Sequence, residues 1–233
     1  MKFQTGLNIL IRSKVYFLIL ICILVSACSS TQKQPAPITD LRNEIALKQG
    51  YHTVVRGETL YFIAWRYSKD YQELAAINHL KSPYALTVGQ KLYLSSNGKA
   101  VIVPIEPMNP AMNVSVKTWL RPAKGNIVGT YSVFNKGVNI AGQLNEPVVA
   151  TASGQVVYAG DGLRGYGNLL ILKHNNEYLS AYAHNQTLLV KEGQWVKAGQ
   201  EIATMGNTGA NQVMLHFEIR KRGKPVDPLK LIE

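Results

Sequence analysis

The chain of 233 residues has few cysteines and few acidic residues. Its two cysteines, Cys22 and Cys28, lie close to the amino terminus, which excludes a disulfide framework for the rest of the chain. The 14 acidic residues are outnumbered by 25 Lys and Arg, so the net charge is +11. Such a balance suits an anionic partner: nucleic acid, lipid headgroups or the carboxylates of a cell-wall polymer. Scattered, solvated Lys and Arg side chains are the alternative.

The sequence also lacks an apolar run long enough to cross a bilayer comfortably. The longest run, residues 15–24, follows Lys2, Arg12 and Lys14, and this arrangement is typical of a signal peptide. The run ends in Leu-Val-Ser-Ala-Cys28, which resembles a bacterial lipobox. The resemblance implies a signal peptide over 1–27 and lipidation of Cys28, for example with palmitate. An uncleaved signal anchor is the alternative.

The predicted anchor leads to further expectations. Ser29, rather than Asp, follows Cys28 and favours sorting to the outer membrane, with the chain facing the periplasm. Removal of residues 1–27 leaves a net charge of +8 and a single, lipid-blocked cysteine. We do not expect nucleic-acid binding, because an exported lipoprotein rarely meets nucleic acid. Residues 28–50 begin with polar residues and proline, which predicts a flexible tether.

Residues 51–94 are predicted to form a small α+β module with the order β-α-α-β. A strand begins at Tyr51, and Thr59 caps a helix in which apolar residues recur at helical spacing. Asp70 begins a second helix, and a strand returns over 88–94. The segment resembles the LysM module in Tyr51-x-x-Val, Gly57-Glu58-Thr59-Leu60-x-x-Ile63-Ala64, Asn78 and Val88-Gly89-Gln90.

LysM modules bind glycans that contain N-acetylglucosamine, such as peptidoglycan. The resemblance therefore implies a glycan site in one turn and one loop of this module. The implied residues are Gly57, Glu58, Thr59, Leu60, Pro83, Tyr84 and Leu86. The alternative is that these residues only cap a helix and close a loop. Residues 95–113 contain three spaced prolines and are predicted to form an extended linker.

Residues 114–233 show no long helical periodicity and are predicted to form an all-β sandwich domain. Short strand patterns separated by Gly, Asn and Pro occur at 126–131, 137–141, 147–151, 154–159, 168–173, 178–184, 201–205 and 214–220. In the last of these, Leu215, Phe217 and Ile219 alternate with Met214, His216 and Glu218.

The landmarks of this second domain resemble the M23 (LytM) zinc peptidases. They are Arg121-Pro122, Asn135-Lys136-Gly137-Val138-Asn139, Tyr182-Ala183-His184, Met205-Gly206-x-Thr208-Gly209 and Leu215-His216-Phe217-Glu218. Leu163-Arg164-Gly165-Tyr166-Gly167-Asn168 and the order lipobox, LysM, LytM are closest to the NlpD-type murein hydrolase activator lipoproteins. The resemblance extends over residues 119–233.

The family's chemistry depends on five positions, of which this chain keeps two. Active members hold zinc with a His, an Asp and a second His, which correspond here to Asn135, Asn139 and His216. Their catalytic His pair corresponds to His184 and Met214. Neutral amides are poor zinc ligands and Met cannot carry a proton. We therefore expect no metal, no cofactor and no catalytic residue, and we interpret His184 and His216 as hydrogen-bonded groove residues.

The remaining groove, formed by Asn135, Asn139, His184, Met214 and His216, is predicted to bind a protein partner. Tyr131, Arg164 and Tyr166 are expected to be exposed around it. The resemblance implies a non-enzymatic activator of an N-acetylmuramoyl-L-alanine amidase, held on peptidoglycan and acting in septal peptidoglycan splitting and daughter-cell separation. An active zinc endopeptidase and a purely structural wall-binding lipoprotein are the alternatives.

Overall fold

A computed structural model describes residues 41–96, 103, 116 and 118–232, all within one compact unit that extends from Ile38 to Glu233. The predicted signal peptide, Cys28, the first part of the tether and most of the predicted linker lie outside the described residues. None of the helices in the described ranges has the length and apolar character needed to cross a membrane. We call residues 51–94 the N-terminal module and residues 118–232 the C-terminal domain.

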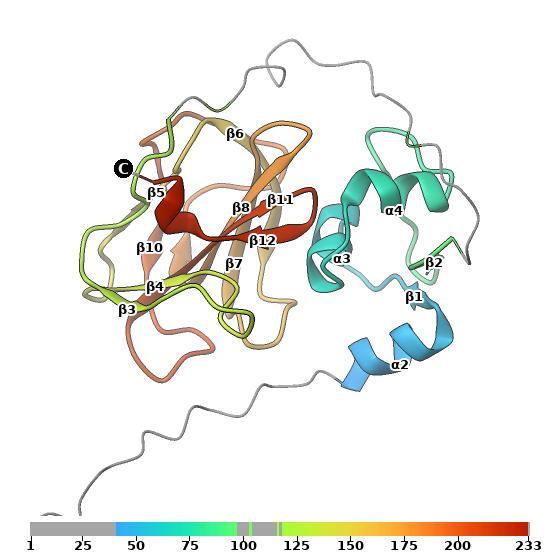
Figure 1. Ribbon diagram of the computed structural model, residues 1–233, viewed down its shortest axis with the longest axis horizontal. Helices are drawn as coiled ribbons and strands as arrows, with labels where there is room; N and C mark the ends of the chain where they lie inside the picture. The colour runs from blue at the N-terminus through green and yellow to red at the C-terminus, as the bar shows by residue number, and fades with distance from the viewer. Residues whose placement is uncertain (1–40, 97–102, 104–115, 117, 233) are drawn as a thin grey trace, which may run out of the picture. The chain divides into compact units, whose positions relative to one another are not determined.

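The N-terminal module has the predicted order of elements (Figure 1). Strands β1 (Tyr51–Thr53) and β2 (Lys91–Tyr93) pair antiparallel, and helices α3 (Leu60–Arg66) and α4 (Tyr71–Ile77) lie between them in sequence. The Thr59 side chain accepts a hydrogen bond from the Phe62 amide, and Asp70 accepts from the Gln72 amide. Both caps satisfy backbone donors that the first helical turn leaves unpaired.

The structure differs from the predicted tether over its last residues, because Leu41–Gln49 forms helix α2. Ala46 of this helix is buried in the hydrophobic cluster of the N-terminal module. The segment contains no Gly or Pro, and Leu, Ala, Glu and Lys favour helix. The helix was not predicted because its apolar residues show only a weak amphipathic pattern.

The C-terminal domain is an antiparallel β-structure, as predicted (Figure 1). The main path of its sheet runs in the order β3-β4-β11-β8-β7-β6-β9, while β10 pairs with β5 and β8, and β12 pairs with β11. The strands are β3 (Ile127–Gly129), β4 (Val138–Ala141), β5 (Pro147–Val149), β6 (Gly154–Gly160), β7 (Asn168–Lys173), β8 (Tyr178–Leu188), β9 (Trp195–Val196), β10 (Glu201–Met205), β11 (Met214–Lys221) and β12 (Lys224–Val226). The short elements β9, β12 and the 3₁₀ turn η2 (Pro228–Lys230) were not predicted.

The two faces of this sheet pack into different hydrophobic clusters. Leu215, Phe217 and Ile219 of β11 are buried in the core of the C-terminal domain. On the opposite face, Val157, Leu169 and Ile171 join a cluster that includes the apolar residues of α3 and α4. His216, Glu218 and Arg220 lie on that second face by strand alternation. We call it the outer face.

A buried histidine in the C-terminal domain gives a pH prediction. His174 directly follows β7; its Nδ1 donates to the Ser153 carbonyl at 2.9 Å and its Nε2 lies 2.7 Å from Ser180 Oγ. Burial lowers its pKa from 6.5 to about 4. Between these two values the unfolded chain binds more protons, so stability falls as the pH drops through this window. His174 alone should remove about 3 kcal/mol between pH 7 and pH 4.

Urea denaturation at several pH values checks this prediction. The variant His174→Gln should lose about 3 kcal/mol less than the wild-type chain over the same pH range. The control variant His79→Asn changes an exposed histidine and should keep the wild-type slope. Equal slopes for all three proteins would contradict a neutral, buried His174.

Candidate functional site

Strand register brings Asn139 and His216 together. The two residues are Cα partners in the antiparallel pair β4·β11, so their side chains share one face. Asn139 Oδ1 lies 2.7 Å from His216 Nδ1. On the other side of β11, His216 pairs with Ala183 of β8, the residue before His184. The sequence prediction that Asn139, His184 and His216 lie close together agrees with this geometry.

Below His216 lies a buried charge network. His216 Nε2 is 3.2 Å from Glu218 Oε1, and the fully buried Glu218 carboxylate accepts from Arg220 Nη2 at 2.8 Å and Nε at 3.0 Å. Burial alone would raise the pKa of Glu218, but the Arg220 charge and the hydrogen bonds from His216 and Tyr166 lower it to about 2. Glu218 is therefore a permanent anion that fixes the His216 ring.

Tyr166 covers this network, which corrects the expectation that it is exposed at the rim. Its hydroxyl donates to Glu218 Oε1 and its ring lies edge-on to His216, with centroids 5.7 Å apart. Burial, together with the Glu218 charge, raises the pKa of Tyr166, so the hydroxyl stays protonated and remains a donor. Arg164 is exposed as expected, while Tyr131 is half-buried and donates to the Pro225 carbonyl.

His184 is held in one tautomer. Its Nδ1 lies 2.8 Å from the Thr208 carbonyl oxygen, which can only accept, so Nδ1 carries the proton. Burial lowers the pKa of His184, and the nearby His216 adds to the shift. The neutral ring keeps an acceptor lone pair on Nε2. The ring centroids of His184 and His216 are 6.1 Å apart. We call Asn139, Tyr166, His184, His216 and Glu218 the His216 cluster.

The two other predicted positions make different contacts. The Asn135 side chain donates to the Thr130 and Gly137 carbonyls and is thereby turned into its own loop. Met214 is half-buried on the His216 side of β11, and its sulfur accepts a weak hydrogen bond from Gln212. Two exposed apolar residues, Val133 and Phe134, directly precede Asn135.

The side chains at the positions that correspond to the zinc ligands of the family do not fit a zinc ion. Both ring nitrogens of His216 are engaged, and Asn139 supplies a neutral amide where a carboxylate is needed to offset the metal charge. Within the described residues, no three His, Cys, Asp or Glu side chains converge as a metal site. Asn139 and His216, two of the three positions that correspond to zinc ligands in active family members, are instead hydrogen-bonded to each other.

The predicted glycan turn of the N-terminal module is built on a second ion network. Glu58 accepts from Arg66 Nη1 at 2.9 Å, lies 2.7 Å from His52 Nε2 and accepts from the Val55 amide at 2.9 Å. Burial would raise the pKa of Glu58, but these partners lower it. Glu58 therefore holds the turn together, and Gly57 supplies its left-handed conformation, with φ +83°.

The other predicted glycan residues differ in exposure. Leu60 and Tyr84 are buried, Thr59 and Leu86 are half-buried, and Gly57 and Pro83 are exposed. The Thr59 hydroxyl donates to the Val157 carbonyl of strand β6 at 3.0 Å. Part of the predicted glycan surface is therefore covered by the C-terminal domain.

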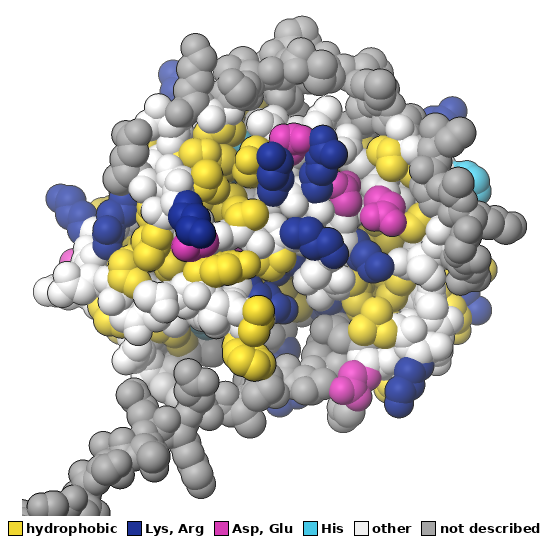
Figure 2. Space-filling model, in the orientation of Figure 1, with side chains coloured by type: hydrophobic (Ala, Val, Ile, Leu, Met, Phe, Trp, Pro, Cys, Tyr) yellow, Lys and Arg dark blue, Asp and Glu magenta, His cyan; other side chains and the backbone are white. Residues whose placement is uncertain are grey.

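The surface charge of the described residues is partly paired. On the face shown in Figure 2, Lys and Arg side chains gather over the region of β11 and β12, with acidic side chains among them. Arg222 and Lys221 both contact Glu177, at 2.5 and 3.8 Å. Exposed pairs of this kind contribute little to stability.

Comparison with known proteins identifies both parts of the chain. Residues 52–95 match the LysM domain model, and residues 133–228 match the model of peptidase family M23. The Lipoprotein NlpD/LppB homolog of Pseudomonas aeruginosa is 40% identical over 91% of this chain and 89% of its own length. The Murein hydrolase activator NlpD of Escherichia coli is 37% identical over 78% and 67%. The Outer membrane antigenic lipoprotein B of Histophilus somni is 38% identical over 76% and 65%.

The fold and the matches define a protein with a LysM domain followed by an M23-type domain. Within that class, the chain belongs to the NlpD/LppB family of lipoproteins. The resemblance stated from the sequence is thereby confirmed, as is the predicted fold class.

The sequence analysis did not predict that Arg220 is buried or that it contacts Trp65. Arg220 is 1% exposed and its guanidinium lies 3.7 Å from the centroid of the Trp65 ring. One signal was available: Glu218 and Arg220 continue the polar face of β11 beyond His216, and adjacent opposite charges on one strand face predict an ion pair.

Proposed function

We propose that this chain is a non-enzymatic activator of a periplasmic N-acetylmuramoyl-L-alanine amidase. In this proposal Asn135, Asn139, His184, Met214 and His216 line a groove, which Tyr166 and Glu218 support from below. The groove captures a segment of the amidase that otherwise blocks the amidase's own zinc site. Capture works only if the groove prefers the open amidase over the closed one. The name of the Escherichia coli relative, Murein hydrolase activator NlpD, supports an activator role.

The observation that carries the proposal is the Asn139–His216 hydrogen bond. It joins two of the three positions at which active family members hold zinc. Glu218, which accepts from Arg220 and Tyr166, contacts the same His216 ring from below. A rigid, satisfied polar cluster is suited to recognition, because binding does not have to order it. His184 Nε2 offers an acceptor and Met214 an adaptable apolar contact beside it.

The N-terminal module supplies attachment in this proposal. It holds the chain on peptidoglycan through Gly57, Glu58, Thr59, Leu60, Pro83, Tyr84 and Leu86, and lipidated Cys28 anchors the chain to the outer membrane, facing the periplasm. One module and one anchor together raise the local concentration at the wall. The site of action we propose is the septum, where peptidoglycan is split and daughter cells separate. The name of the Histophilus somni relative supports the outer-membrane location.

An amidase assay on purified sacculi tests the proposal. The full chain, stripped of metal by a chelator that is then removed, should stimulate an amidase from the source organism. Met214→Lys places a charge in the proposed groove and should reduce stimulation about 30-fold, the loss typical of a central interface residue. Val128→Lys is the matched control on an exposed strand position and should stimulate like the wild type.

Two results would contradict the proposal. Failure to stimulate any amidase of the source organism would leave a structural wall-binding role. Release of muropeptides by the chain alone, dependent on stoichiometric zinc, would instead establish an endopeptidase.

A further inference from the structure

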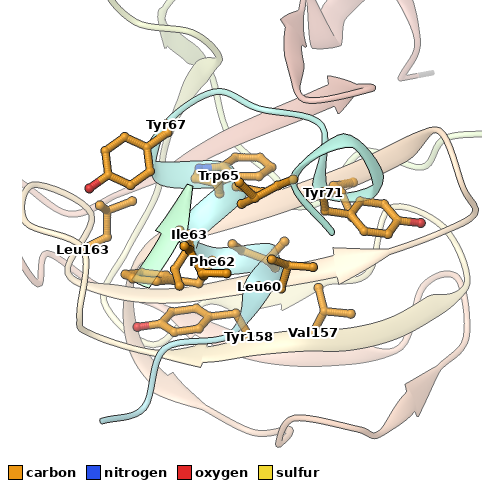
Figure 3. Packing of buried hydrophobic residues seen from close by; sticks show 14 of the residues in the cluster. Leu60, Phe62, Ile63, Trp65, Tyr67, Tyr71, Val157, Tyr158 and Leu163 are labelled. Atoms are coloured by element: carbon orange, nitrogen blue, oxygen red, sulfur yellow. The ribbon is translucent and has the colours of Figure 1, made fainter. Parts of the chain in front are cut away.

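The N-terminal module packs on the outer face of the C-terminal domain. Phe62 of α3 stacks on Tyr158 of β6 with ring centroids 4.4 Å apart and planes inclined by 23°. Figure 3 shows Leu60, Phe62 and Ile63 above Val157 and Tyr158, with Leu163 beside them. The labelled residues belong to one buried cluster, so the apolar face of α3 is satisfied by the sheet.

Hydrogen bonds and cation–π contacts also join the N-terminal module to the C-terminal domain. Arg66 Nη2 donates to the Gly162 carbonyl at 3.1 Å, and the Thr59–Val157 hydrogen bond joins the other end of α3 to β6. Lys173 of β7 places its ammonium 4.8 Å from the Tyr71 ring and 5.6 Å from the Tyr61 ring. Both tyrosines also pack against Tyr84 of the predicted glycan loop.

One contact leads directly to the His216 cluster. Arg220 Nη1 donates to the Trp65 carbonyl at 2.7 Å, and the guanidinium stacks on the Trp65 ring. The same guanidinium binds Glu218, which contacts His216. Helix α3 therefore covers the ion pair that supports the proposed partner site.

The backbone approaches as closely as the side chains. A Cβ atom added to Gly223, in the turn between β11 and β12, would lie 2.3 Å from the Lys69 carbonyl carbon and oxygen and 2.5 Å from the Asp70 amide nitrogen. Lys69 and Asp70 connect α3 to α4. Any side chain at position 223 is therefore incompatible with the packed arrangement.

We propose that the N-terminal module uses one surface for two mutually exclusive partners, the outer face of its own C-terminal domain and the glycan strand of peptidoglycan. Thr59 and Leu60 belong to both surfaces, because they are predicted glycan residues and they pack against Val157 of β6. Attachment to the wall then releases α3 from β6 and β7. Release uncovers the outer face beside the His216 cluster for the amidase, so the activator becomes competent only on peptidoglycan. This inference rests on the proposed function.

The competition has a measurable consequence for glycan affinity. When only a fraction of the chains has the module released, the apparent dissociation constant is the intrinsic one divided by that fraction. A variant that prevents packing should therefore bind glycan more tightly than the wild-type chain.

Gly223→Asn is such a variant. Asn tolerates the left-handed backbone at this position, with φ +74°, while its side chain meets the Lys69 backbone. Gly193→Asn is the matched control, because its φ is +85° and an added Cβ has no atom within 4 Å. Calorimetric titration of the full chains with chitohexaose should give about tenfold tighter binding for Gly223→Asn. Gly193→Asn should equal the wild type.

A second pair of variants provides an independent route. Leu163→Asp places a charge in the buried interface, and Leu189→Asp places the same charge at an exposed position. Leu163→Asp should also tighten chitohexaose binding about tenfold, and Leu189→Asp should not. Circular dichroism confirms that each variant is folded.

The outcomes separate this inference from the proposed function. Equal chitohexaose affinity for the wild type and both interface variants would overturn the competition and leave glycan binding intact. Absence of binding by every protein would overturn the competition together with the glycan role. In either case amidase stimulation by the full chain, measured separately on sacculi, still tests the activator role.

Discussion

Replacing Arg220 with methionine should lower the free energy of unfolding by about 3–5 kcal/mol, because it leaves the buried Glu218 carboxylate without its cation. Glu218 is fully buried and accepts two hydrogen bonds from the Arg220 guanidinium. Methionine keeps an unbranched apolar stem but is shorter than arginine, so the loss combines the uncompensated charge with the lost contacts of the guanidinium to Trp65. Urea denaturation at pH 7, followed by circular dichroism, measures the change.

The double variant Glu218→Gln with Arg220→Met is the control for this interpretation. It removes both charges, and it should recover a large part of the stability that each single variant loses. If the two single losses simply add in the double variant, Glu218 and Arg220 do not act as a coupled pair and the assignment is wrong.

Restoring zinc binding should require changes at Asn135 and Asn139. Asn139→Asp puts a carboxylate beside His216, whose Nδ1 is 2.7 Å from the present amide oxygen, and Asn135→His supplies the missing imidazole. The combined variant should bind one zinc per chain with a dissociation constant of about 1 μM or lower, equivalent to about 8 kcal/mol. Metal analysis after dialysis, together with calorimetry, measures the gain.

Met214→His alone should bind no zinc, because both asparagines remain and His216 stays hydrogen-bonded. Adding His216→Ala to the combined variant should abolish the new site. Stoichiometric zinc in Met214→His alone would show that the assignment of ligand positions is incorrect.

The strands could be predicted because their signals are local. Alternation along β11 separates Phe217 from His216, and glycines mark the turns between strands. The pairing of Asn139 with His216 came from the family resemblance, and the structure supplies its register.

The docking of the N-terminal module could not be predicted, because it depends on residues far apart in sequence. Phe62 reads as an ordinary helix residue and Tyr158 as an ordinary strand residue, and neither pattern indicates that they stack. Tyr166 was expected to be exposed for the same reason, since only the tertiary structure places Glu218 under its hydroxyl. Contacts between residues far apart in sequence do not produce a periodic pattern in the sequence, so they could not be predicted from it.

The burial of Arg220 beneath Trp65 gives the junction between the two parts of the chain a distinctive response to heat. Packing of α3 withdraws the guanidinium and its carboxylate partner from water, and this dehydration opposes closure. Ionic dehydration becomes less unfavourable as the temperature rises. Moderate warming should therefore hold the two parts together more firmly, while cooling, which also weakens the apolar contact between Phe62 and Tyr158, should loosen them.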